Sequence, residues 1–102
     1  MTSNISVGVL CAIFISAHAV VAHYVDSEGR KYIAKTAAQG VILESRNLTM
    51  QLWRNCSASS RQYGKGTWAW ANGGFSVIFA GTSVRFPRQE IDLDNNGACR
   101  EE

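Results

Sequence analysis

Residues 67–86 read TWAWANGGFSVIFAGTSVRF, and this stretch indicates the fold class. Aromatic or aliphatic residues alternate with small or polar ones on both sides of its centre, as in strands that bury one face. The Asn-Gly-Gly run at 72–74 supplies the positive φ angles that a tight hairpin turn requires. Gly81 turns the chain again, and Pro87 ends the last strand because proline cannot donate to a ladder. We therefore predict an antiparallel meander of three strands.

Three further strands are predicted upstream, over Lys31–Lys35, Val41–Leu43 and Leu48–Leu52. The last of these has the clearest pattern, with apolar residues at every second position. We expect Asn55–Gly66 to be a loop, because it is rich in Ser, Gly, Arg and Lys. Ile91 and Leu93 are candidates for one more short strand. No segment has sustained helical periodicity, so the chain is predicted to be all-β, as a sandwich or a small barrel.

The first 22 residues carry no charged side chain, and Val7–Ala22 is almost wholly apolar. This run ends in small residues, which predicts a secretory signal peptide over residues 1–22, cleaved after Ala19 or Ala22. The alternatives are a membrane anchor and a buried N-terminal strand. An anchor needs roughly 20 apolar residues, and no Lys or Arg flanks this run before Arg30. We expect a single β domain over residues 23–102, secreted from the cell.

Three cysteines bear on the stability of so small a domain. Cys11 lies in the predicted signal peptide, which leaves Cys56 and Cys99 as an even pair in an oxidising compartment. A disulfide between them would close 99 − 56 = 43 residues of chain and stabilise the fold by about 4 kcal/mol. Free thiols or an intermolecular bridge are the alternatives. The predicted fold is thus a small disulfide-stapled β-sandwich of about six short antiparallel strands.

Charge and histidine content limit the possible activities. The 10 basic and 8 acidic residues leave a net charge of +2, and the basic residues are spread along the chain, which argues against nucleic-acid binding. His23 is the one histidine outside the predicted signal peptide, and we expect it to be exposed near the new N-terminus. A small hydrolase or ribonuclease would have to use Glu44, Glu90 and Arg85. We predict no enzymatic activity and no cofactor.

Residues 92–97 resemble the start of a calcium loop, with Asp92, Asp94 and Asn96 at alternate positions before a glycine. Pro87 and the strand-like Ile91 do not fit the helix that should precede such a loop. We therefore predict an Asx-rich turn without a metal, and keep the three residues as weak calcium candidates.

Two N-glycosylation sequons lie outside the predicted signal peptide, at Asn47-Leu48-Thr49 and Asn55-Cys56-Ser57. We expect Asn55 to be the less accessible of the two, since it is next to a disulfide cysteine.

Three tryptophans complete the set of candidate residues. Trp68 and Trp70 should share one face of their strand, and we predict that at least one of them belongs to the core. Trp53 falls on the opposite face from Leu52 and is the better candidate for an exposed aromatic. An exposed row of tryptophans would instead indicate a secreted carbohydrate-binding or antimicrobial domain.

The segment Gly29–Ala37, GRKYIAKTA, resembles the Gly-x-Lys-Tyr-Ile-x-Lys-x-Ala that opens the mature Pik-type avirulence effectors. With the signal peptide, short strands and single disulfide, the chain is similar to the MAX effectors of plant-pathogenic fungi. The resemblance implies two three-stranded sheets packed face to face and virulence by binding host proteins, in some members heavy-metal-associated domains, without catalysis. Cys56 comes later in the chain than the first cysteine of most members.

The predicted partner is therefore a host protein, bound by a monomer either outside the cell or after translocation into host cells. We expect Lys31–Thr36 to be an edge strand, because alternating lysines protect natural sheet edges from self-pairing. Lys31, Ile33 and Lys35 should share one face of it. These three residues and Trp53 are the candidate partner-binding residues.

Overall fold

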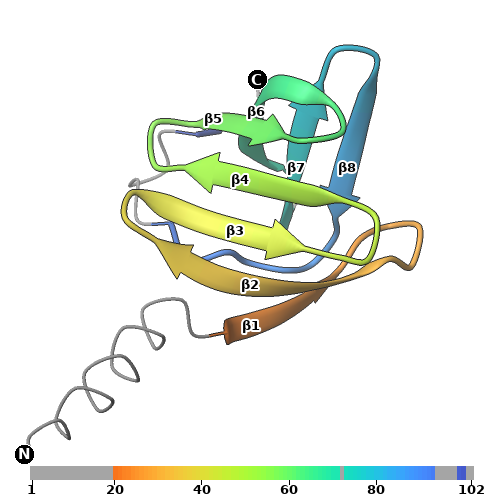
Figure 1. Cartoon of the computed structure of the whole chain (residues 1–102), viewed down its shortest axis with the longest axis vertical. Helices are drawn as coiled ribbons and strands as arrows, with labels where there is room; N and C mark the ends of the chain where they lie inside the picture. The colour runs from red at the N-terminus through yellow and green to blue at the C-terminus, as the bar shows by residue number, and fades with distance from the viewer. Residues whose placement is uncertain (1–19, 72, 94–98, 101–102) are drawn as a thin grey trace, which may run out of the picture.

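The structure is a computed structural model that describes residues 20–71, 73–93 and 99–100. Eight antiparallel strands form one sheet in which every strand pairs with the next along the chain (Figure 1). The strands are β1 (Val20–Val25), β2 (Lys31–Ala37), β3 (Gly40–Glu44), β4 (Thr49–Trp53), β5 (Ser57–Ser60), β6 (Gly64–Ala71), β7 (Gly74–Phe79) and β8 (Thr82–Phe86). Within the described ranges there is no helix of the length and apolarity needed to span a bilayer.

The sheet curls into a half-barrel, so that β7 and β8 lie across the direction of β2, β3 and β4 (Figure 1). Strand β6 makes the corner, because its first half pairs with β5 and its second half with β7. Gly66 belongs to both pairings, and a Cβ atom there would lie 2.2 Å from the carbonyl oxygen of Ile78. Glycine therefore allows the close backbone approach that a sharp bend in a sheet needs.

The concave side of the curl holds the core. Tyr32, Leu43, Met50, Leu52, Trp68, Phe75, Val77 and Phe86 are its largest fully buried side chains. Phe75 and Phe86 stack with their ring centroids 4.6 Å apart, which joins β7 to β8. The predicted all-β class, the antiparallel meander and the Cys56–Cys99 disulfide are confirmed. The finer prediction of a six-strand sandwich is not, because two additional strands extend the sheet into a single curl.

Both additional strands lie where the sequence pattern is weak. Strand β1 includes His23, which we expected near a new N-terminus after cleavage, and β5 lies inside the predicted Asn55–Gly66 loop. The sequence of β5 is Ser-Ala-Ser-Ser, of which only Ala58 is buried. It is a strand because β4 and β6 pair with its backbone on both sides, and this tertiary context outweighs its low β-propensity.

The prediction that Lys31–Thr36 is an edge strand is wrong. Strand β2 pairs with β1 from Lys31 to Lys35 and with β3 from Ile33 to Ala37. The two ends of the sheet are β1 and β8. The error follows from β1, since a strand that is not anticipated turns the expected edge into an interior strand.

The segment after β8 closes the open side of the curl. Figure 1 shows its described part, residues 87–93, running from the end of β8 behind β3 and along β2. Ile91 and Leu93 do not form the predicted strand, but both are buried in the core. The hydroxyl of Tyr24 donates to the carbonyl oxygen of Glu90 at 2.7 Å, which fixes the segment against β1.

The two predicted cleavage points lie before and within the described strand β1 (Val20–Val25). Cleavage after Ala22 would remove Val20 and Ala22, which pair with Lys35 and Ala34 of β2.

Candidate functional site

The outer edge of β1 is the candidate site. Two of its outward positions, Val25 and Ser27, are hydrogen-bonded to residues in or just after β8. In an antiparallel strand, alternate residues direct both backbone groups to the same side. The N–H of Asp26 donates to the carbonyl oxygen of Arg30, so Asp26 directs its backbone groups toward β2. The residues that alternate with it, Ser27, Val25 and His23, therefore direct their backbone groups outward. The N–H of Ser27 donates to the carbonyl oxygen of Arg85 at 2.8 Å. The first turn thereby covers the middle of β8's own edge.

The outward groups of Val25 are occupied by the side chain of Gln89. The Val25 N–H donates to Oε1 of Gln89 at 2.9 Å, and Nε2 of Gln89 donates to the Val25 carbonyl oxygen at 2.7 Å. One side-chain amide thus makes the two hydrogen bonds that a residue of a neighbouring strand would make. A third bond, from Nε2 to the Pro87 carbonyl oxygen, holds this amide in place.

His23 is the next outward residue, and its backbone groups have no hydrogen-bond partner among the described residues. Its side chain is exposed, as predicted, although it lies on a strand rather than in a frayed terminus. As far as residues 20–71, 73–93 and 99–100 show, the edge of β1 is therefore occupied at Ser27 and Val25 and open at His23. An open edge of this kind can accept an extended peptide as an additional strand.

A buried carboxylate fixes the turn at the end of this edge. Asp26 is 5% exposed, and its Oδ1 accepts the backbone N–H groups of Glu28 and Arg30, both at 2.9 Å. Its Oδ2 accepts from Nη1 of Arg30 at 2.9 Å and from the Tyr32 hydroxyl at 2.8 Å. Four hydrogen bonds, one of them part of an ion pair, compensate the burial of this charge. The turn that carries Ser27 is consequently held in one conformation.

Three of the four predicted partner-binding residues lie on the convex face of β2, the strand next to this edge. Lys31, Ile33 and Lys35 alternate with the buried Tyr32 and Ala34, which confirms that they share one face. Lys35 is ion-paired with Glu44 of β3, with 3.1 Å between Nζ and Oε1. Lys31 is exposed and has no ion pair within the described part of the chain.

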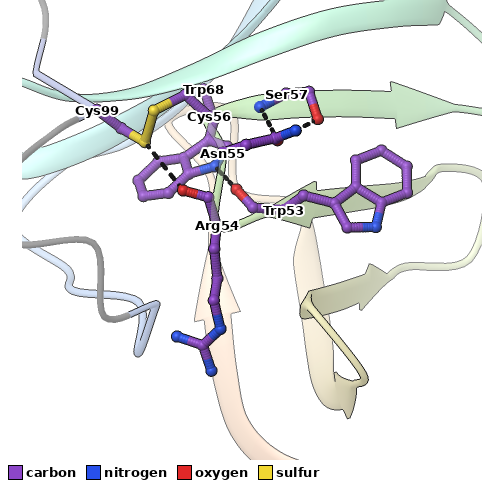
Figure 2. Close-up of a disulfide and its surroundings, with 7 residues drawn as sticks. All are labelled: Trp53, Arg54, Asn55, Cys56, Ser57, Trp68 and Cys99. Carbon is purple, nitrogen blue, oxygen red and sulfur yellow. Dashed lines mark hydrogen bonds between the residues drawn. A yellow bond between two sulfur atoms is a disulfide. The ribbon is translucent and has the colours of Figure 1, made fainter.

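Trp53, the fourth predicted partner-binding residue, is half-buried on β4 and lies opposite the inward direction of Leu52, as expected. It borders the turn that carries the disulfide (Figure 2). Gln39, Trp53, Arg54, Asn55 and Ser57 line an open depression there. Two hydrogen bonds reach the Trp53 carbonyl oxygen, from Nε1 of Trp68 at 2.7 Å and from the Cys56 N–H at 3.0 Å.

The tryptophans do not form an exposed row. Trp68 is 1% exposed, which confirms that at least one of the pair belongs to the core. Trp70 is half-buried and packs edge-on against Trp68, with ring centroids 5.3 Å apart. Trp53 belongs to the convex side, whereas Trp68 and Trp70 belong to the concave side.

The candidate catalytic residues are distributed over the surface. Glu44 is engaged by Lys35, and neither Glu44 nor Glu90 lines the two shallow depressions that contain Arg85. No group of three His, Cys, Asp or Glu side chains that could hold a metal occurs among the described residues. Asp92 is exposed, and the other calcium candidates, Asp94 and Asn96, lie outside the described residues.

No known protein family, curated protein or solved structure matches this chain. The similarity of Gly29–Ala37 to the MAX effectors therefore stays a prediction carried by those nine residues. In the structure this segment is the end of the first turn and all of β2.

The hydrogen-bonded cluster of Asp26, Arg30 and Tyr32 makes the stability of the protein sensitive to alkaline pH. Burial raises the pKa of Tyr32 above its ordinary value near 10, and the hydrogen bond to Asp26 adds to the shift. Above pH ~10 the unfolded chain loses a phenol proton that the folded chain keeps. The contribution of Tyr32 to the free energy of unfolding should therefore be complete below that pH. Above it, the free energy of unfolding should fall by at most about 1.4 kcal/mol per pH unit for this group.

Urea titrations between pH 8 and 11 would measure this effect. Tyr32→Phe should be less stable at pH 8, because it loses the hydrogen bond to Asp26, but its stability should fall less steeply above pH ~10. The same slope in both proteins would show that Tyr32 does not cause the alkaline loss. Some slope should persist in the variant, since burial also raises the pKa of Tyr24.

Proposed function

We propose that this chain is a small secreted effector of a plant-pathogenic fungus, which binds a host protein at the open edge of β1 and performs no catalysis. The proposal rests chiefly on His23, whose outward backbone groups have no partner among the described residues, while the next two outward positions are both satisfied. Within that part of the chain, two specific contacts protect the end of this edge and none protects its beginning. A peptide strand added at His23 would continue the antiparallel order of the sheet.

The surroundings of His23 favour a partner strand with acidic side chains. His23 pairs with Ile33 on β2, and Lys31 and Lys35 flank Ile33 on the same convex face. Glu44 already neutralises Lys35, which leaves Lys31 as the stronger attraction for a partner carboxylate. Charges at the rim of an interface set the association rate and the choice of partner more than the affinity.

The fate of the tryptophans supports protein binding over the carbohydrate-binding alternative. A sugar-binding platform would need several accessible rings on one face. Trp68 is instead buried in the core, and Trp53 and Trp70 lie on opposite sides of the sheet.

His23→Pro should abolish partner capture while preserving the fold. Proline removes the outward N–H of His23 but leaves the ladder with β2 intact, because Tyr24 and Ala22 carry the inward groups. Capture of host protein from tissue extract should fall at least roughly tenfold, as expected for losing a backbone hydrogen bond and the space beside it. Circular dichroism and urea unfolding would confirm that the variant is folded.

Two charge variants separate the edge from general electrostatics. Lys31→Glu should slow association roughly three- to tenfold at low salt. Lys65→Glu makes the same charge change on an exposed lysine of β6 and should have little effect. If folded His23→Pro captures the partner as well as the wild type, β1 is not the interface. If purified protein hydrolyses a glycan or RNA and Glu44→Gln or Glu90→Gln abolishes that activity, the non-enzymatic proposal fails.

A further inference from the structure

The turn between β4 and β5 has the geometry of a modification site, with an amide nitrogen facing solvent beside an aromatic ring. Asn55 is exposed, and its Oδ1 accepts two hydrogen bonds from Ser57, from the N–H at 3.0 Å and from the hydroxyl at 2.6 Å. Its Nδ2 has no hydrogen-bond partner in the described part of the chain. Asn55 and Ser57 are the first and third residues of a sequon, so the oxygen is fixed and the nitrogen is left accessible.

We propose that Asn55 carries an N-linked glycan whose first sugar lies on the indole of Trp53. The inference rests on the proposed secretion, since the transfer occurs in the secretory pathway. The donor is a lipid-diphosphate-linked oligosaccharide. Nδ2 of Asn55 forms a bond to C1 of its first sugar, the bond from C1 to the diphosphate oxygen breaks, Nδ2 releases one proton, and the lipid diphosphate leaves.

The contacts that prepare Asn55 are local. Both hydrogen bonds to Ser57 span two residues, so the chain can form them before the sheet is complete. The sequence alone led us to expect that the neighbouring Cys56 would hinder access to Asn55. The turn instead directs the disulfide and the Asn55 side chain to opposite sides (Figure 2).

Trp53 lies two residues before Asn55 and lines the same depression as Asn55 and Ser57. Figure 2 shows its ring and the Asn55 side chain both projecting away from the disulfide. A sugar linked to Nδ2 would bring its apolar C–H face against a ring that is otherwise half-exposed. The backbone of this turn is already fixed by the bond from Trp68 and by the disulfide, so stacking would cost little additional ordering.

Asn47 is the natural comparison, because it is also exposed and also begins a sequon. The N–H of its Thr49 donates to Oε1 of Gln62 on another turn, at 3.1 Å, rather than to Asn47. The local arrangement present at Asn55 is therefore not formed at Asn47. We expect Asn55 to be the preferred acceptor, the reverse of the order that the sequence alone predicts.

Peptide mapping of the full chain would test the inference. The chain is expressed in a eukaryotic cell behind that cell's own signal peptide, so that entry into the secretory pathway does not depend on residues 1–19. Enzymatic deglycosylation in ¹⁸O-labelled water then marks each occupied asparagine by a mass increase. We expect the mark at Asn55, its loss in Asn55→Gln and in Ser57→Ala, and its retention in Asn47→Gln. An unmarked Asn55 in the secreted wild type would overturn the proposal.

The stacking on Trp53 has its own measurement. Deglycosylation should increase quenching of tryptophan fluorescence by acrylamide in the wild type, and this increase should disappear in Trp53→Leu. An occupied Asn55 with unchanged quenching would overturn the stacking. Expression with the chain's own first 19 residues, in parallel, measures secretion separately, and partner capture by Asn55→Gln measures the proposed function without the glycan.

Discussion

Cys99→Ser is expected to lower the free energy of unfolding by about 2–5 kcal/mol, the range for removing a native disulfide from a small secreted domain. The bridge joins the turn after β4 to the C-terminal segment and closes a separation of 43 residues. Opening a loop of that length alone should cost about 4 kcal/mol in the chain-entropy model. Cys99 is also 3% exposed, and its carbonyl oxygen accepts the N–H of Trp70 at 2.6 Å. Losing the bridge should therefore also loosen the contact between the C-terminal segment and β6.

Urea unfolding with and without reductant would measure this loss. Reduction of the wild type should reproduce the stability of Cys99→Ser. The double variant Cys56→Ser with Cys99→Ser should match either single variant to within about 0.5 kcal/mol, because all three lack the same covalent bond. An unchanged midpoint in Cys99→Ser, or in the reduced wild type, would contradict a structural role for the disulfide.

The strands that the sequence predicted are those whose side chains alternate between core and solvent. Met50 and Leu52 point inward on β4, and Phe75 and Val77 do so on β7, so hydrophobic period and burial agree. Strand β5 could not be found in this way, because Ala58 is its one buried residue. It is a strand because its backbone pairs with β4 and β6, and a local pattern of hydrophobic residues does not report such pairing.

The candidate site was predictable in its faces but not in its edges. Alternation along β2 correctly placed Lys31 and Lys35 on one face, and it also directed Trp53 away from the core. Whether a strand lies at an edge depends instead on the topology of the whole sheet. The apolar run at Val20–Ala22 was assigned to a signal peptide, so β1 and its open position at His23 were not anticipated.

The role of Gln89 had no signal in the sequence. Its amide substitutes for a strand residue beside Val25, although 64 residues separate the two. A pairing of this range depends on the curl that brings β8 back to β1, because Ser27 and Arg85 meet at the same place. The opening at His23 and its protected neighbour at Val25 are thus two consequences of one long-range closure.

Trp68→Ala is expected to lower the free energy of unfolding by about 3–5 kcal/mol, the range for deleting a buried large aromatic side chain. Trp68 is 1% exposed and lies at the middle of the corner strand β6, where its ring packs edge-on against Trp70. Its Nε1 also donates to the Trp53 carbonyl oxygen at 2.7 Å, so the loss would include a hydrogen bond worth about 1 kcal/mol.

Trp53→Ala is the matched control. It removes the same side chain from a half-exposed position and should cost clearly less. Trp68→Phe keeps most of the ring but not the donor. It should show an intermediate loss of stability. Urea unfolding of the three variants would give this order, and equal losses in Trp68→Ala and Trp53→Ala would show that Trp68 does not anchor the core.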